Sequence, residues 1–193
     1  MSLEEQALGL RRLLTTDRLN FAKKFLQIDP MWDGVEKMIH SVFDHRRTAV
    51  QSANSMSKDF TAGIVVLQWL FTYPGASKVI CTGPTRTQVK EITFAEIAKE
   101  FARARIASPW QLDLDCMKST KLDLGPDWFA LGLTTKETHQ MVGKFHGFKS
   151  PNLLVIGTEA QAVEEAVFDQ FYGLLTGDNC RIIELGNPMM CAG

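Results

Sequence analysis

Lys58 lies between an apolar run typical of a strand, residues 48–52, and a longer run typical of a helix, residues 58–73. A lysine in the first turn of a helix is slightly unfavourable, because the helix dipole favours negative charge there. A bound anion would offset that cost, since the N–H groups of a helix N-terminus and an ammonium group both attract phosphate oxygens. The sequence therefore predicts a phosphate-binding loop here, and the alternative is a solvated lysine at a helix start.

The loop departs from the usual phosphate-binding pattern, G-x-x-x-x-G-K-[ST], at three positions. Ser52 and Ser57 replace the two glycines, and Asp59 replaces the hydroxyl residue after the lysine. Glycine serves where the backbone needs positive φ or approaches a ligand closely, and serine is strained at positive φ. The replacements weaken the pattern without excluding it. The predicted nucleotide-binding residues of the loop are Ser52, Ala53, Asn54, Ser55, Met56, Ser57, Lys58 and Asp59.

Further candidate residues follow two other strand-like runs. Thr158 ends the apolar run 152–158, and Glu159 comes directly after it. A carboxylate at the carboxyl end of a strand faces the crevice where α/β folds bind ligands. The alternative is a surface acid at a strand-to-helix turn. Asn187 follows the run 180–186, where Asn-Pro is also a common turn initiator.

Alternating strands and helices must position these residues. The strand-like runs are 48–52, 78–83, 127–133, 152–158 and 180–186. The helix-like runs that follow the first 45 residues are 58–73, 85–106 and 162–175. Nearly continuous apolar strands separated by helices predict an α/β fold with a mostly parallel sheet flanked by helices on both faces. A β-hairpin is predicted within 108–133, and the first 45 residues are predicted to be helical, with a turn at 29–34.

Composition restricts the class of protein. The chain has 193 residues, is 45% hydrophobic and has a net charge of -1, which fits a globular domain without a strongly basic or acidic surface. Its apolar runs are too short to span a bilayer, and its acidic start is unlike a signal peptide. The scattered cysteines predict neither a zinc site nor a disulfide framework, which favours a reduced, cytoplasmic setting. Because the sequence stops directly after a predicted strand, we expect it to be a fragment.

Five motifs fall in a definite order along the chain. They are DPMW at 29–32, the loop around Lys58, TGPTRTQ at 82–88, KFHGFKSPNLLVIGTEAQ at 144–161 and LGNP at 185–188. Together they resemble the ATPase domain of phage terminase large subunits, the motors that package DNA into capsids. The resemblance spans residues 29–188 and implies a RecA-like P-loop NTPase core at 46–193 after a helical N-terminal extension at 1–45. It also implies that a nuclease domain would follow Gly193.

The resemblance implies ATP and Mg²⁺ as ligands. Lys58 would contact the β- and γ-phosphates, and Glu159 occupies the catalytic position of the family's Walker B strand. Asn187 matches the family's coupling residue, which senses the γ-phosphate. Trp32 corresponds to an aromatic residue that stacks on adenine, but Asp33 stands where the family has an adenine-reading glutamine. The alternative for Trp32 is an ordinary core residue.

Asp59 and Thr158 look like an exchange of two metal-site residues. In the resembling family a hydroxyl follows the lysine and an aspartate precedes the catalytic glutamate. Here the carboxylate and the hydroxyl have changed places. Mg²⁺ accepts oxygen ligands from either element, so we expect Asp59 to bind or support the metal and Thr158 to hydrogen-bond beside it. The alternative is drift after loss of activity, with Asp59 a helix N-terminal acid that the dipole favours.

The function implied by the resemblance is ATP hydrolysis coupled to translocation of double-stranded DNA into a capsid, in the host cytoplasm. The implied partners are DNA, a portal, a small terminase subunit and further copies in a ring, with no membrane. Two alternatives stay open: a terminase-like nucleotide-binding module with lost or reduced hydrolysis, and a different RecA-type helicase or translocase. Arg46 and Arg47 are interpreted as solvated, although they could reach phosphates or a neighbouring subunit, and His146 as structural.

The variant Asp59→Ala should abolish nucleotide binding that depends on Mg²⁺, because it lacks the carboxylate expected to hold the metal. Isothermal titration with a non-hydrolysable ATP analogue, with and without Mg²⁺, measures this dependence. Unchanged Mg²⁺-dependent binding in the variant would refute the proposed exchange.

Overall fold

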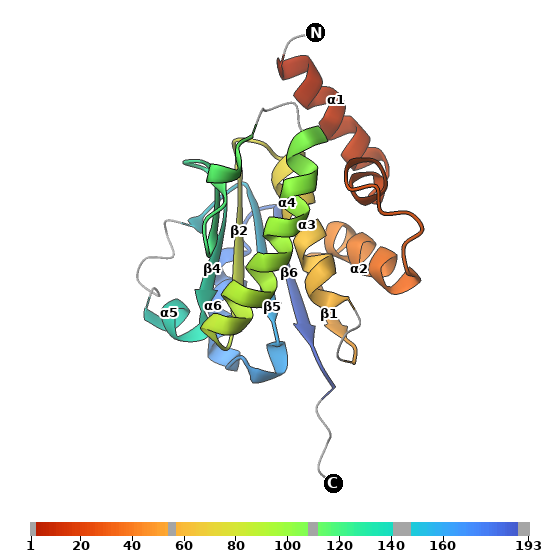
Figure 1. The fold of residues 1–193 in the computed structure, drawn as a ribbon. Coiled ribbons are helices and arrows are strands. Elements are labelled where there is room, and N and C mark those ends of the chain that lie inside the picture. Colours follow the sequence, from red (N-terminus) through yellow and green to blue (C-terminus); the bar gives the residue numbers. More distant parts are fainter. Residues whose placement is uncertain (1–2, 54–56, 108–111, 141–147, 189–193) are drawn as a thin grey trace.

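A computed structural model describes residues 3–53, 57–107, 112–140 and 148–188. Within these residues a six-stranded sheet forms the centre of the molecule (Figure 1). Its strands are β1 (Arg47–Gln51), β2 (Ser77–Gly83), β3 (Lys121–Gly125), β4 (Trp128–Thr134), β5 (Asn152–Thr158) and β6 (Asn179–Gly186). The order across the sheet is β1-β6-β5-β2-β4-β3, and only the β3–β4 pair is antiparallel. The predicted mostly parallel sheet and hairpin are confirmed, and the arrangement is consistent with a RecA-like fold.

Helices cover both faces of the sheet. The helical elements are α1 (Leu3–Thr16), η1 (Phe21–Phe25), α2 (Asp33–Asp44), α3 (Lys58–Thr72), η2 (Gln88–Thr93), α4 (Phe94–Ala107), η3 (Leu114–Cys116), α5 (Thr135–Gln140), η5 (Ala160–Ala162) and α6 (Glu165–Leu174). Figure 1 shows α1 to α4 on one side of the sheet and α5 and α6 on the other. No helix of the described residues is long and apolar enough to cross a membrane.

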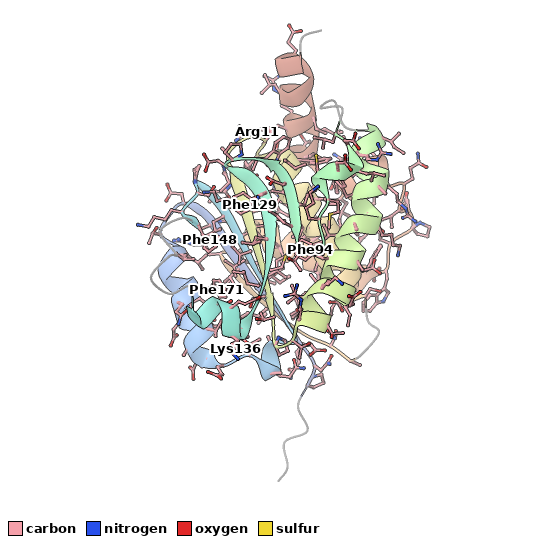
Figure 2. All side chains as sticks on the ribbon, turned by 60° about the vertical axis from the view of Figure 1, so that its left-hand side comes forward. Arg11, Phe94, Phe129, Lys136, Phe148 and Phe171 are labelled. Carbon is pink, nitrogen blue, oxygen red and sulfur yellow. The ribbon has the colours of Figure 1, made fainter. Side chains whose placement is uncertain are left out.

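Alternation along the strands builds two apolar cores, one on each face. On β5, Leu154 and Ile156 join the core beneath α1 to α4, while Leu153 and Val155 join the core beneath α6. The helix α3 is buried along its whole length after the first turn, which its apolar composition predicts. Figure 2 shows Phe94 on the α4 side and Phe148 and Phe171 on the α6 side of the sheet.

Two helices differ from the prediction. The run predicted at 162–175 becomes a short turn, η5, followed by α6, because the backbone of Glu164 is extended (φ -64°, ψ 138°). The helix α5 was not predicted, although its start has a capping box: the Glu137 N–H donates to the Thr134 hydroxyl (3.2 Å), and the Thr134 N–H donates to the Glu137 carboxylate (2.7 Å).

The parallel strands bring their carboxyl ends to one edge of the sheet. Gln51 of β1 lies opposite Gly186 of β6, and Thr158 of β5 lies opposite Leu185. The residues that follow these strands, including the loop before Lys58, therefore meet at this edge. This arrangement fits the rule that open α/β sheets bind ligands at the carboxyl ends of their strands.

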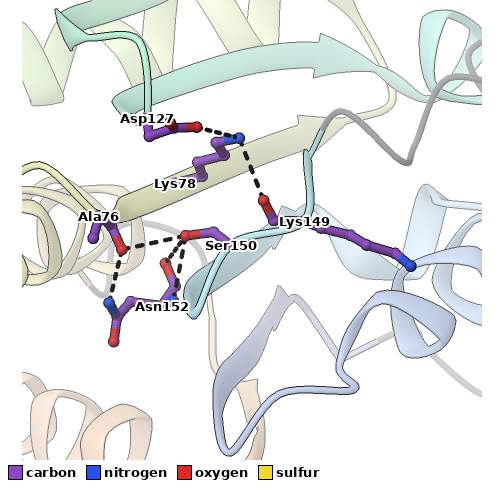
Figure 3. A network of polar contacts seen from close by, with 6 residues as sticks. All are labelled: Ala76, Lys78, Asp127, Lys149, Ser150 and Asn152. Atoms are coloured by element: carbon purple, nitrogen blue, oxygen red, sulfur yellow. Dashed lines mark hydrogen bonds and ion pairs between the residues drawn. The ribbon is translucent and has the colours of Figure 1, made fainter.

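A polar network holds the opposite, amino ends of the strands in register (Figure 3). The Asn152 amide donates to the Ala76 carbonyl (2.7 Å) and accepts from the Asn179 amide (2.6 Å), which joins the starts of β2, β5 and β6. The buried Lys78 ammonium lies 3.0 Å from the Asp127 carboxylate and donates to the Lys149 carbonyl (3.3 Å). A slip of one residue would turn every side chain of a strand to the other face of the sheet. By holding the starts of β2, β5 and β6 in register, these bonds also align the carboxyl ends of the three strands.

The variant Asn152→Ala should lower the free energy of unfolding by about 2 kcal/mol, because both side-chain hydrogen bonds of Asn152 are lost. Urea unfolding followed by circular dichroism measures the change. Asn179→Ala removes only one of these two bonds and should cost less. Equal stability of wild type and Asn152→Ala would contradict this role of the network.

Candidate functional site

A pocket of about 430 Å³ opens at the carboxyl edge of the sheet. It is lined by the residues that follow β1, β5 and β6 and by one side of η2 and α4: Ser57, Lys58, Asp59, Phe60, Gln88, Glu91, Ile92, Ala95, Glu96, Thr158, Glu159, Leu185, Gly186 and Asn187. The structure thus brings together six residues singled out by sequence, namely Ser57, Lys58, Asp59, Thr158, Glu159 and Asn187. The predicted loop residues Asn54, Ser55 and Met56 lie outside the described part of the chain, as does His146.

The Lys58 ammonium group is held by four oxygen atoms. It donates to the Ser52 carbonyl (2.8 Å), the Ala53 carbonyl (2.8 Å), the Ser52 hydroxyl (3.2 Å) and Oδ1 of Asn187 (2.7 Å). Burial lowers the pKa of Lys58, and the nearby Asp59 carboxylate partly opposes that shift. Because an ammonium group has three hydrogens, a phosphate oxygen can bind it only by replacing one of these partners.

Ser57 occupies a left-handed backbone conformation (φ 61°, ψ 21°) directly before α3. This conformation costs a non-glycine residue about 1–2 kcal/mol. The neighbouring helix fixes it, since the Ser57 carbonyl accepts the Thr61 N–H (2.9 Å) and the Thr61 hydroxyl (2.8 Å). Of the two serines that replace glycines, only Ser57 has positive φ, so of these two positions only the one next to the lysine is strained.

Asp59 is a partly buried carboxylate in the first turn of α3. Burial raises its pKa, and the nearby carboxylates of Glu159 and Glu96 raise it further, while Lys58 and a backbone N–H lower it. Its hydrogen-bond partner is the Gln88 amide, whose Nε2 donates to Oδ1 (3.2 Å). With Glu91, four carboxylates and a single lysine line this pocket, so its charge favours a cation.

The carboxylates that line the pocket are too far apart to form a complete metal-binding site by themselves. Among the described residues, no three His, Cys, Asp or Glu side chains converge closely enough to hold a metal ion. Mg²⁺ in nucleotide sites commonly uses one or two carboxylates together with phosphate oxygens and water. Asp59, with Glu159 near it, fits that smaller requirement.

Thr158 is buried beside the pocket, at 2% exposure, and its hydroxyl donates to the Thr82 carbonyl of β2 (3.2 Å). Gln88 lies close by, because a Cβ atom on Gly83 would approach both the Thr158 hydroxyl (2.9 Å) and Cγ of Gln88 (3.2 Å). The Thr158 hydroxyl therefore donates its hydrogen bond to β2, whereas the Asp59 carboxylate accepts a hydrogen bond from Gln88. In the sequence, Gln88 ends the TGPTRTQ motif at 82–88, and no separate role is predicted for it.

Glu159 also has a left-handed backbone (φ 49°, ψ 47°), at the point where β5 turns into η5. The turn is closed by the Ala162 N–H, which donates to the Glu159 carbonyl (2.8 Å). Non-glycine residues in this conformation cluster at functional sites, where the surrounding structure holds them in place. Its carboxylate lies in the same pocket as Lys58.

Trp32 lines a second pocket, of about 370 Å³, together with Ser52 and residues of α2 and β1. It is 50% exposed, so it is not an ordinary core residue. Its ring lies against Gly34, where a Cβ atom would come within 2.2 Å of the indole. Ser52 also accepts hydrogen bonds from Lys58 of the first pocket, so this one residue links the linings of the two pockets.

The paired arginines lie at the opposite end of β1 from Lys58. Arg46 donates to the carbonyls of Leu175 and Gly177 beyond the end of α6, and the Arg47 guanidinium stacks on the Tyr172 ring at 4.1 Å from its centroid. Arg47 begins β1, and the pocket lies beyond the other end of that strand. Neither arginine belongs to the pocket that holds Lys58.

Comparison with known proteins gives one distant similarity. No protein-family model matches the chain. A protein of Enterobacteria phage P7 described as "Probable terminase, large subunit" is 26% identical to it over 167 residues. The alignment covers 85% of this chain but 33% of the phage protein, so the chain spans about a third of that relative. The similarity supports a terminase-like relationship.

The variant Asp59→Asn should be more stable than the wild type at neutral pH, and its advantage should shrink as the pH falls. The folded state raises the pKa of Asp59 above its ordinary value of about 3.9, so the charged carboxylate destabilises the fold above that raised pKa. Protonation relieves this cost as the pH drops through the raised pKa toward the ordinary value. Urea unfolding at several pH values measures both proteins.

Asp169→Asn, at an exposed position of α6, is the matched control for that comparison. The change in unfolding free energy that it causes should vary less with pH. An Asp59→Asn protein that is less stable than the wild type at neutral pH would contradict the assigned cause of the pKa shift.

Proposed function

We propose that the chain binds Mg·ATP in the pocket around Lys58 and hydrolyses it, as the ATPase part of a terminase-like DNA-packaging motor. The observation that carries this proposal is the convergence of Lys58, Asp59, Glu159 and Asn187. These residues come from three separate strand connections and meet at the carboxyl edge of a parallel sheet. In order, they would supply an ammonium group that binds phosphate, a carboxylate that supports the metal, a carboxylate that orients water and an amide that senses the γ-phosphate.

The phosphates would lie against the amino end of α3. Free N–H groups of the first helical turn attract phosphate oxygens, and the Lys58 ammonium is already within reach of the loop that would surround them. To contact the β- and γ-phosphates, the ammonium would exchange one protein oxygen for a phosphate oxygen. The loop residues Ser52 to Ser57 would supply the remaining contacts.

Metal binding follows from the charge of the pocket. The carboxylates of Asp59, Glu91, Glu96 and Glu159 would repel a bare triphosphate, and Lys58 alone cannot balance them. We therefore expect the nucleotide to bind as its Mg²⁺ complex, with Asp59 contacting or supporting the metal. The oxygen of Thr158 keeps its lone pairs and could accept a hydrogen bond from a metal-bound water.

Glu159 would orient the attacking water toward the γ-phosphate. Asn187, which accepts a hydrogen bond from Lys58, would lose that bond when a γ-phosphate oxygen binds the lysine. The base would enter the second pocket and stack on Trp32, whose half-exposed ring already lies at the pocket wall. Ser52 lines that pocket and bonds Lys58, so one nucleotide could span both sides of the loop.

The wider role rests on the similarity to the phage P7 protein, of which this chain spans about a third. By that similarity, ATP hydrolysis would drive double-stranded DNA into a capsid in the host cytoplasm. The partners would be a portal, a small terminase subunit and further copies of the chain in a ring. A nuclease domain would belong to the remaining part of such a protein.

A second candidate function is a nucleotide-binding module with lost or reduced hydrolysis. Two observations favour it: the strained backbone of Ser57 beside the lysine, and the buried hydroxyl of Thr158 at the position where the resembling family has a metal-supporting carboxylate. This module would bind Mg·ATP and release little or no phosphate.

Two variants separate these functions. Lys58→Ala should weaken binding of a non-hydrolysable Mg·ATP analogue at least about tenfold, the equivalent of one charge-assisted hydrogen bond. Glu159→Gln should keep binding and lower the rate of phosphate release by about 10²–10⁴-fold, the usual contribution of a residue that acts on water. Lys136→Ala, an exposed change on α5, is the control for lysine loss.

Titration calorimetry and a phosphate-release assay measure these effects. Motor function predicts that wild type turns over ATP and Glu159→Gln does not. The module predicts that both proteins bind and neither turns over. A wild-type protein that binds no nucleotide with Mg²⁺ present would exclude both candidates.

A further inference from the structure

Gln161 joins the turn that carries Glu159 to the residue that contacts Lys58. It lies in η5, two positions after Glu159, and its Oε1 accepts the backbone N–H of Asn187 (2.9 Å). The side chain of Asn187 in turn accepts the Lys58 ammonium through Oδ1 (2.7 Å). A continuous series of two hydrogen bonds therefore runs from the β5 connection, through the β6 connection, to the start of α3.

Close packing fixes this series in place. A Cβ atom on Gly186 would lie 3.0 Å from Oε1 of Gln161, which is tighter than ordinary contact, so the glutamine fits against the bare backbone there. From the other side, the Ser52 N–H donates to the Gly186 carbonyl (3.2 Å). The peptide between Gly186 and Asn187 is thus held on one side by Ser52, in the loop that precedes Lys58, and on the other by Gln161, in the turn that follows Glu159.

Phosphate binding would act on this arrangement. Of the four oxygens around Lys58, two are backbone carbonyls, one is the hydroxyl of the loop residue Ser52, and the Asn187 amide alone belongs to another strand connection. When a phosphate oxygen replaces that amide, Asn187 is left with the backbone bond to Gln161. The hydrogen bond from the Asn187 backbone to Gln161 then fixes the position of the released side-chain amide relative to the phosphates.

We propose that Gln161 is a positioning residue that holds Asn187 beside the phosphate site, so that the pocket distinguishes a nucleoside triphosphate from a diphosphate. This inference rests on the proposed nucleotide binding and assigns to Gln161 a role in ligand selection at that site. Gln161 does not line the pocket and acts through Asn187.

The test compares two replacements of nearly equal length. Gln161→Met removes the acceptor and keeps the volume, whereas Gln161→Glu keeps an acceptor oxygen. The measured quantity is the ratio of dissociation constants for ADP and for a non-hydrolysable ATP analogue, both with Mg²⁺, by titration calorimetry. We expect the wild type to bind the triphosphate more tightly than the diphosphate. In Gln161→Met this preference should fall about tenfold, the equivalent of one hydrogen bond. In Gln161→Glu most of the preference should remain. Glu165→Gln, exposed on α6, is the control.

A purely structural role for Gln161 would lower stability and weaken both nucleotides equally, leaving the ratio unchanged. An unchanged ratio in Gln161→Met, or a wild type without preference, therefore overturns the inference while the proposed function stands. A wild type that binds neither nucleotide overturns the proposed function itself. Hydrogen exchange of the backbone N–H of Asn187 gives a readout without nucleotide. This N–H should exchange faster in Gln161→Met than in Gln161→Glu, and equal rates would refute the positioning contact.

Discussion

The ammonium group of Lys58 links two connections that lie 129 residues apart in the chain, the loop after β1 and the turn after β6. This contact exists because β1 and β6 are parallel neighbours, with Gln51 opposite Gly186, so that both strands end at the same level. The level is set at the far end of the sheet, where Asn152 ties the starts of three strands together. The pocket thus depends on strand register as much as on the residues that line it.

Sequence was sufficient for the sheet and for the approximate place of the site. The run 152–158 is apolar between its polar ends, Asn152 and Thr158, because both faces of the strand are covered, and this pattern can be recognised from the sequence of the strand alone. Parallel strands must end at one edge, so residues directly after them were bound to meet. Position after parallel strands, together with the ordered motifs of the resemblance, grouped Lys58, Glu159 and Asn187, and the pocket lining contains all three.

The hydrogen-bond partners inside the site could not be obtained in this way. Asp59 is bonded by Gln88 and Asn187 by Gln161, and each pair joins separate elements whose spacing depends on packing. Likewise, the left-handed backbones of Ser57 and Glu159 are imposed by tertiary context, since neither residue type favours them. By contrast, the capping box that starts α5 is a local pattern, T-x-x-E at 134–137, that can be recognised from sequence.

Among the described residues, β1 forms a ladder with β6 alone and lies at the edge of the sheet. An interior strand spreads an applied load over two ladders, whereas this one transmits it through five residue pairs on a single side. A pull on anything bound to the loop before Lys58 would therefore reach the rest of the molecule by two routes, through the β1–β6 ladder and through the buried helix α3 that begins at Lys58. In a protein proposed to move a polymer, the β1 side of the proposed nucleotide site thus depends on one short row of hydrogen bonds, while the other side rests on a buried helix.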